Sequence, residues 1–148
     1  MGKLTGIARR EKKRAPMEAL ESAEITTDSG VAGDFRGKPG KRQVTLLSVS
    51  DWQAACDELG RDVLWTTRRS NLLIDGMDLP RQPGVVIAIG DVLLRTTREI
   101  DPCSRMDEQE PGLTKALLPD WRGGVGCEVL RGGTVSVGNS VSLASEDS

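Results

Sequence analysis

Short stretches in which apolar and polar residues alternate recur along most of this chain, and they predict β-strands. Successive side chains of a strand point to opposite faces, so such a stretch places its apolar residues on one face, against a core. Residues 17–27 have helix-forming Ala, Leu and Glu, but the preceding Pro16 and the Gly-rich exit favour a strand. The expected strands cover residues 3–8, 17–27, 43–49, 71–76, 85–89, 92–97, 125–130, 135–137 and 141–143.

Helical spacing predicts two helices, and glycine pairs predict the turns. The first helix is expected to begin at a Ser50 cap and to end at Gly60, and a short second helix is expected at 113–118. The apolar face of the first helix would hold Trp52, Ala55, Cys56 and Leu59. Gly90-Asp91 is typical of a hairpin turn, and Gly138-Asn139 predicts that the last two strands form a closing hairpin.

Together these elements predict one mainly β domain, a β-barrel with one or two short helices. The 148 residues form a single domain, 1–148, with a core at about 3–143 and a frayed acidic C-terminal tail. The charged run 9–14 is interpreted as a solvated loop rather than an anion-binding arm. The Gly-rich loop 28–40 lacks a nucleotide-binding motif, and Asp34 is expected to fix that loop through its own backbone N–H groups.

The composition excludes several classes of function. The net charge of −2 and the four aromatic residues (Phe35, Trp52, Trp65 and Trp121) argue against nucleic-acid binding. Histidine is absent, which excludes Ser-His-Asp and Cys-His catalysis and His-ligated zinc. No apolar run reaches the ~20 residues of a membrane span, so a cytoplasmic protein without a membrane partner is expected.

Three cysteines carry the candidate chemistry. Cys56 and Cys127 lie on apolar faces and are expected to be buried, whereas Cys103 follows Pro102 in a polar loop. Because the number of cysteines is odd and they lie far apart in the chain, no disulfide framework is expected, which fits a reducing cytoplasm. The nearby Arg98 and Arg105 would favour the thiolate, which is both a nucleophile and a soft metal ligand. The alternative for Cys103 is an exposed, unreactive thiol.

A series of glycine-rich and polar motifs occurs in an order that resembles the MOSC domain, the C-terminal domain of molybdenum cofactor sulfurases, which also occurs as stand-alone bacterial proteins. The resemblance spans residues 6–143, and Pro102-Cys103 is its most specific element. The other motifs are Gly-Val-Ala-Gly-Asp at 30–34, Arg-Gln-Val-Thr at 42–45, Arg69 with Asn71-Leu72, Gly-Asp-Val-Leu at 90–93, Pro-Gly-Leu at 111–113, Arg-Gly-Gly at 122–124 and the 132–138 run.

The resemblance implies that Cys103 is the catalytic residue, as a carrier of activated sulfur, or the ligand to molybdenum in a molybdopterin-type cofactor. It also implies a mainly β fold, and some relatives reduce N-hydroxylated compounds. Pyridoxal phosphate would enter only through a partner desulfurase, because no such domain fits in this chain. Relatives often carry His after the Gly-Asp pair, but Phe35-Arg36 follows Asp34 here, so a role for that His does not transfer.

Arginines beside these motifs are the expected ligands of a pterin phosphate, because guanidinium groups bind phosphate through paired N–H donors. The cofactor-binding set is Arg42, Arg69, Asn71, Arg98, Arg105 and Arg122. Each arginine has solvated surface as its alternative role, and Asn71 could equally cap a strand end. The alternative function is a non-catalytic module that binds a small anion or relays sulfur from a separate desulfurase. A reductase would also need an electron-transfer partner.

Overall fold

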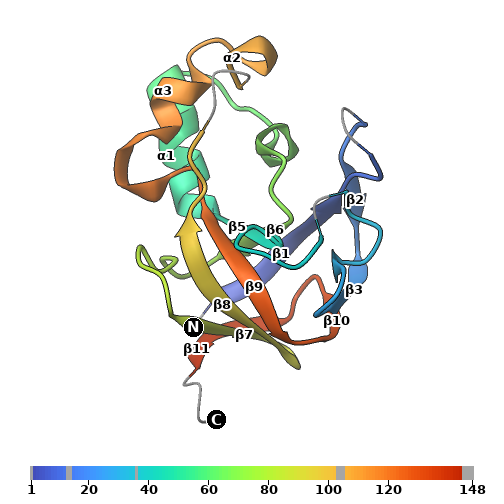
Figure 1. The fold of residues 1–148 in the computed structure, drawn as a ribbon. Helices are drawn as coiled ribbons and strands as arrows, with labels where there is room; N and C mark the ends of the chain where they lie inside the picture. The colour runs from blue at the N-terminus through green and yellow to red at the C-terminus, as the bar shows by residue number, and fades with distance from the viewer. Residues whose placement is uncertain (1, 13–14, 36, 103–105, 145–148) are drawn as a thin grey trace.

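The computed structural model describes residues 2–12, 15–35, 37–102 and 106–144, and its main body is a closed β-barrel (Figure 1). The barrel strands are β1 (Gly2–Arg9), β5 (Val44–Ser48), β6 (Leu72–Asp75), β7 (Val86–Ile89), β8 (Val92–Glu99), β9 (Val125–Arg131) and β11 (Ser140–Ala144). They pair in the order β11-β7-β8-β9-β5-β6-β1, and β11 pairs again with β1. The predicted mainly β, barrel-like fold is confirmed.

The expected closing hairpin is wrong, because the last two strands pair with different partners. β10 (Gly133–Ser136) pairs with β3 (Ser22–Thr26) in a small sheet that also contains β4 (Gly30–Val31). β11 instead pairs with β7 and with the first residues of β1. The barrel can close only if its last strand lies between β7 and β1, and local turn signals carry no information about that closure.

The N-terminal half otherwise follows the alternating pattern. Residues 17–27 contain two strands, β3 and β2 (Glu18–Leu20), which confirms the strand interpretation. β2 extends the barrel sheet beyond β1. β7 and β8 form the predicted hairpin around Gly90.

Helices gather at one end of the barrel, at the top in Figure 1. They are α1 (Val49–Leu59), α2 (Met106–Gln109) and α3 (Leu113–Leu117), with 3-10 helices η1 (Trp65–Arg68) and η2 (Pro119–Trp121). The N-cap of α1 is Ser48 rather than the expected Ser50, since the Ser48 hydroxyl accepts a hydrogen bond from Asp51 N (3.4 Å). Gly60 ends α1 as predicted, at φ 73°, a left-handed conformation that glycine adopts without strain.

Two apolar clusters hold the fold together. The first fills the barrel and includes Cys127, which has no exposed surface, as the alternation predicts. The second lies between the barrel and α1 and α3, and it includes Cys56 and Trp52. The predicted burial of Cys56 and Cys127 is therefore confirmed. Among the described residues, no helix has both the length and the apolar character needed to cross a membrane.

The end of β1 fastens the Gly-rich loop. Arg10 is buried at 6% exposure, so the interpretation of 9–14 as a wholly solvated loop is wrong at this residue. Its backbone N–H donates to the Asp34 carboxylate (3.0 Å), and its guanidinium lies 5.7 Å from the Phe35 ring centroid. The Asp34 carboxylate thus joins the Gly-rich loop to the end of β1. Arg14 and Arg36 lie outside the described residues, as does the C-terminal tail 145–148.

Candidate functional site

The approach to Cys103 is a tightly held segment, residues 99–102, which we call the Cys103 stem. Its first residue, Glu99, is the last residue of β8. Ile100 N then donates to Gly124 O (3.0 Å), which adds one hydrogen bond beyond the β8–β9 pairing. Ile100 and Pro102 are buried. Cys103, Ser104 and Arg105 lie outside the described residues. The described chain therefore fixes the position from which the predicted catalytic loop departs.

Arg68 anchors this stem from η1. Its side chain is 8% exposed, and its Nε donates to Gly123 O (3.0 Å) while its Nη2 donates to Ile100 O (2.8 Å). One buried guanidinium thus ties the stem to the Gly-Gly turn that precedes β9. Sequence reasoning selected the neighbouring Arg69, which ends η1 in a left-handed conformation (φ 64°) and is partly exposed. Nothing in the sequence distinguishes these two arginines, because the direction of each side chain depends on how η1 packs.

The Gly-Gly turn at 123–124 is made of glycine because other backbone lies too close for a side chain. A Cβ on Gly123 would stand 2.5 Å from Ile100 O and 3.1 Å from Arg68 Nη2. A Cβ on Gly124 would overlap Leu46 O, and Gly124 has φ 102°. The turn, Arg68 and the stem therefore form one compact unit.

Charged groups line the stem. Arg98 Nη2 lies 3.7 Å from Asp101 Oδ2, and both side chains are at least half exposed. The pKa of Glu99 is raised, first by burial and then by the charge of Asp101 and a hydrogen bond with it. Arg98 therefore lies directly before the stem and is paired with Asp101, and its role as a phosphate ligand stays a prediction.

Of the other predicted ligands, Asn71 and Arg122 form hydrogen bonds within the protein, and Arg42 lies at the surface. Asn71 is buried, its Oδ1 accepts from Thr45 N (3.0 Å), and its Nδ2 donates to Ala8 O (3.2 Å). Its amide thus joins β1, β5 and β6, which favours the strand-end alternative. Arg122 donates to the Glu58 carboxylate (3.1 Å) and to Ala116 O (3.0 Å), linking α1 and α3. Arg42 is exposed just before β5.

The two described cysteines are both buried. Burial raises the pKa of the Cys127 thiol far above its usual range, and the charge of Glu128 raises it further. Cys56, on the buried face of α1, is 4% exposed. The described residues also contain no group of three or more Cys, Asp or Glu side chains placed to share a metal ion. The predicted molybdenum ligand, Cys103, is not among them.

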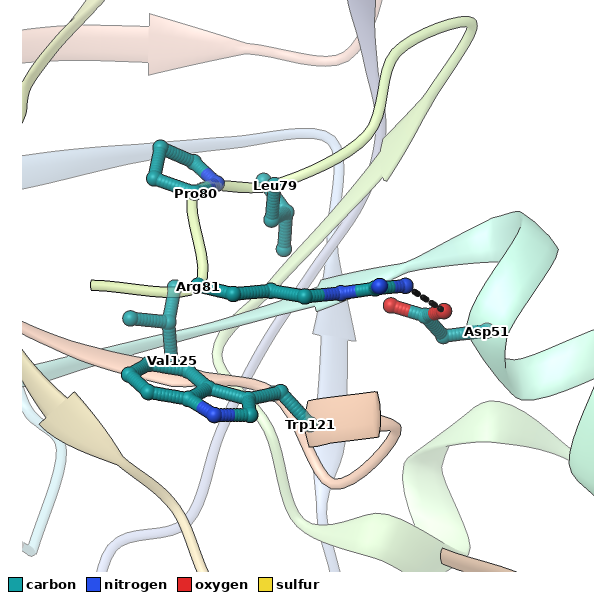
Figure 2. A pocket seen from close by; sticks show the side chains of 7 residues that line it. Asp51, Leu79, Pro80, Arg81, Trp121 and Val125 are labelled. Carbon is teal, nitrogen blue, oxygen red and sulfur yellow. Dashed lines mark ion pairs between the residues drawn. The ribbon is translucent and has the colours of Figure 1, made fainter. Parts of the chain in front are cut away.

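A small pocket lies beside the Gly-Gly turn, and Gly124 is one of its lining residues (Figure 2). Its volume is about 180 Å³, including the part open to solvent. The Arg81 side chain extends across it toward Asp51, with the Trp121 indole alongside, and Arg81 Nη2 lies 3.8 Å from Asp51 Oδ1. The remaining lining residues are Leu79, Pro80, Gly124 and Val125. Sequence reasoning missed this pocket, because its residues come from three separate stretches of the chain, at 51, 79–81 and 121–125.

Comparison with known proteins identifies the family. A model of the MOSC domain matches residues 30–142. The chain belongs to the MOSC domain family. The matched region of this MOSC protein runs from β4 to β11 and contains the Cys103 stem, the Gly-Gly turn and the pocket. No curated protein sequence matches it.

Solved structures share the fold of this MOSC protein at low sequence identity. The YuaD protein from Bacillus subtilis is 19% identical with a TM-score of 0.80, over 95% of this chain and 94% of that one. YiiM from Geobacillus stearothermophilus is 15% identical with a TM-score of 0.78, over 98% of this chain and 76% of that one. YiiM from Escherichia coli is also 15% identical, with a TM-score of 0.72, over 97% of this chain and 70% of that one. At such identities the likeness is one of fold.

Proposed function

We propose that this MOSC protein acts through Cys103, which accepts a sulfane sulfur from a separate pyridoxal-phosphate desulfurase or coordinates the molybdenum of a pterin cofactor. The observation that carries the proposal is the anchoring of the Cys103 stem by the buried Arg68. A buried arginine whose donors bind the backbone of this segment is a costly arrangement, and it holds the stem in place as far as Pro102. Cys56 and Cys127 are buried in apolar clusters, which leaves Cys103 as the reactive thiol.

Sulfur transfer requires only a thiolate at position 103. The Cys103 thiolate attacks the terminal sulfur of a persulfide on the desulfurase, and a new S–S bond forms at Cys103. The S–S bond of the donor breaks, and its electron pair leaves with the donor thiolate. No external oxidant or reductant is consumed, because the sulfane sulfur only changes partners.

For the molybdenum role, the donor chemistry at the stem suits the cofactor. A Cys103 thiolate is a soft ligand, and the exposed Arg98 guanidinium could exchange Asp101 for a pterin phosphate. The cofactor would supply oxygen-atom or sulfur chemistry at the metal, with Arg98 and the partly exposed Arg69 holding its phosphate. The Arg81 pocket, at about 180 Å³ with the part open to solvent included, leaves no room for such a cofactor beside the Arg81 side chain.

The test compares Cys103→Ser with Cys56→Ala, a matched change at a buried cysteine. Protein from a molybdenum-replete host is assayed for metal and pterin, and the purified protein is mixed with a desulfurase and cysteine. We expect either stoichiometric molybdenum or a mass gain of one sulfur atom in the wild type and in C56A, and neither in C103S. Normal loading of C103S would overturn the proposal. An empty wild type that forms no persulfide would favour the non-catalytic, anion-binding alternative.

A second prediction concerns thiol reactivity. In the folded protein, iodoacetamide should modify one thiol per chain, Cys103, while Cys56 and Cys127 react only after denaturation. The thiolate is the reacting form, and burial suppresses it at Cys127. Mass spectrometry of peptides after a short exposure measures the pattern. Modification of Cys127 at a rate similar to that of Cys103 would contradict it.

A further inference from the structure

We propose that Asp51 and Trp121 form a binding site for a planar cationic group, an amidinium or a guanidinium, and that Arg81 occupies this site when no ligand is bound. The site is the pocket of Figure 2. The proposal is independent of the chemistry of Cys103, because it rests on described residues outside the stem.

The Asp51 carboxylate is only partly compensated. Its side chain is 18% exposed, and the Arg81 Nη2 to Asp51 Oδ1 distance of 3.8 Å exceeds hydrogen-bond length. Its pKa is raised, first by burial and then by the charges of Asp78 and Asp120, while Arg81 and Arg122 lower it. Of those two cations, Arg122 is also bound to Glu58 and Ala116 O. A mostly buried carboxylate to which no described residue donates a close hydrogen bond is an acceptor suited to a ligand with two parallel N–H groups.

Arg81 shows that a cationic side chain can lie across the pocket. Its aliphatic part passes between the Leu79–Pro80 segment and the Trp121 indole, and its guanidinium reaches Asp51 (Figure 2). Half of the Arg81 side chain is exposed, and a loose ion pair of this kind contributes only about 0–1 kcal/mol. An incoming cation could therefore displace Arg81 at little cost.

Charge and shape select the class of ligand. The negative charges of Asp78 and Asp120 both act on the Asp51 carboxylate, so the site favours a cationic ligand over an anionic one. The Trp121 indole lines the pocket, and a cation–π contact with a ligand there would favour planar delocalised cations over a compact ammonium. Gly124 lines the pocket and its carbonyl accepts from Ile100 N, so the ligand would lie beside the wall of the Cys103 stem.

Benzamidine is the probe, and its binding is measured by calorimetry at low salt in the wild type and three variants. R81A should bind up to about fivefold more tightly, because the internal competitor is gone. Asp51→Asn, made in the R81A background, should weaken binding at least about tenfold, because it removes a charge-assisted acceptor. Asp57→Asn, an exposed acid on the same helix, is the matched control and should change nothing.

Benzoate, which has the same shape and opposite charge, should not bind R81A. Thermal unfolding of each variant confirms that it folds, and C103S should bind benzamidine like the wild type, which separates this proposal from the one on Cys103. Equal affinity of R81A and wild type, together with no loss in the D51N variant, would overturn the proposal. So would an equal loss in D51N and D57N, because binding would then follow surface charge alone.

Discussion

Replacing Arg68 by methionine is expected to lower the free energy of unfolding by about 3 kcal/mol, because it leaves two buried carbonyl groups without a donor. These are Ile100 O and Gly123 O, which the guanidinium now binds at 2.8 and 3.0 Å. Lysine cannot reproduce two diverging donors, so Arg68→Lys should recover only part of the loss. Urea unfolding of the three proteins measures the effect.

Arg61→Met is the matched control for Arg68. The Arg61 guanidinium also donates to a backbone carbonyl, Pro111 O (2.9 Å), and pairs with Glu110 (2.6 Å), but its side chain is 49% exposed. Its loss should therefore cost about 0–1 kcal/mol. Arg68→Met should in addition change the alkylation rate of Cys103 under native conditions, which Arg61→Met should not. Equal costs of the two changes would show that burial of Arg68 adds nothing.

Gly124→Ala should destabilise the protein by about 4 kcal/mol, through backbone strain and steric overlap together. The added Cβ meets Leu46 O inside contact distance, and φ 102° is unfavourable for alanine. Leu46 is a buried residue of the barrel, so its carbonyl can yield only if β5 shifts. Thermal and urea unfolding measure the loss.

Gly138→Ala separates the two causes. Gly138 has the same φ of 102°, but nothing lies within 4 Å of its Cβ position. Its substitution should therefore cost only the backbone strain, about 1–3 kcal/mol. If G124A is no less stable than G138A, the close approach of Leu46 O is not what requires glycine in the turn.

The alternating pattern predicted most strands correctly because it depends on local geometry. A residue and its second neighbour share a face whatever the rest of the fold does, so burial of Cys127 could be read from Val125 and Val129. The same holds for Cys56 on α1, where helical spacing set the buried face. Pairing is different. β10 and β11 were correctly placed as strands, but their partners depend on barrel closure.

At the candidate site, too, local sequence patterns predicted some features, and the packing of the whole fold decided others. The order of motifs led to the MOSC family, and the position of Cys103 after Pro102 led to the thiol proposal. The residue that anchors the stem is Arg68, whereas the sequence favoured Arg69, since two adjacent arginines look alike until η1 is packed. Asn71 and Arg122, expected as ligands, donate to the protein itself.

The sequence by itself determined the family, most strand positions, the helices α1 and α3 and the burial of Cys56 and Cys127, because each of these follows from local periodicity or from motif order. The tertiary structure decided which strands close the barrel, which arginine is buried, and that Asp51, Arg81 and Trp121 share a pocket. These last features join segments far apart in the chain. Their contacts arise only when the barrel and its helices pack, and no local pattern encodes them.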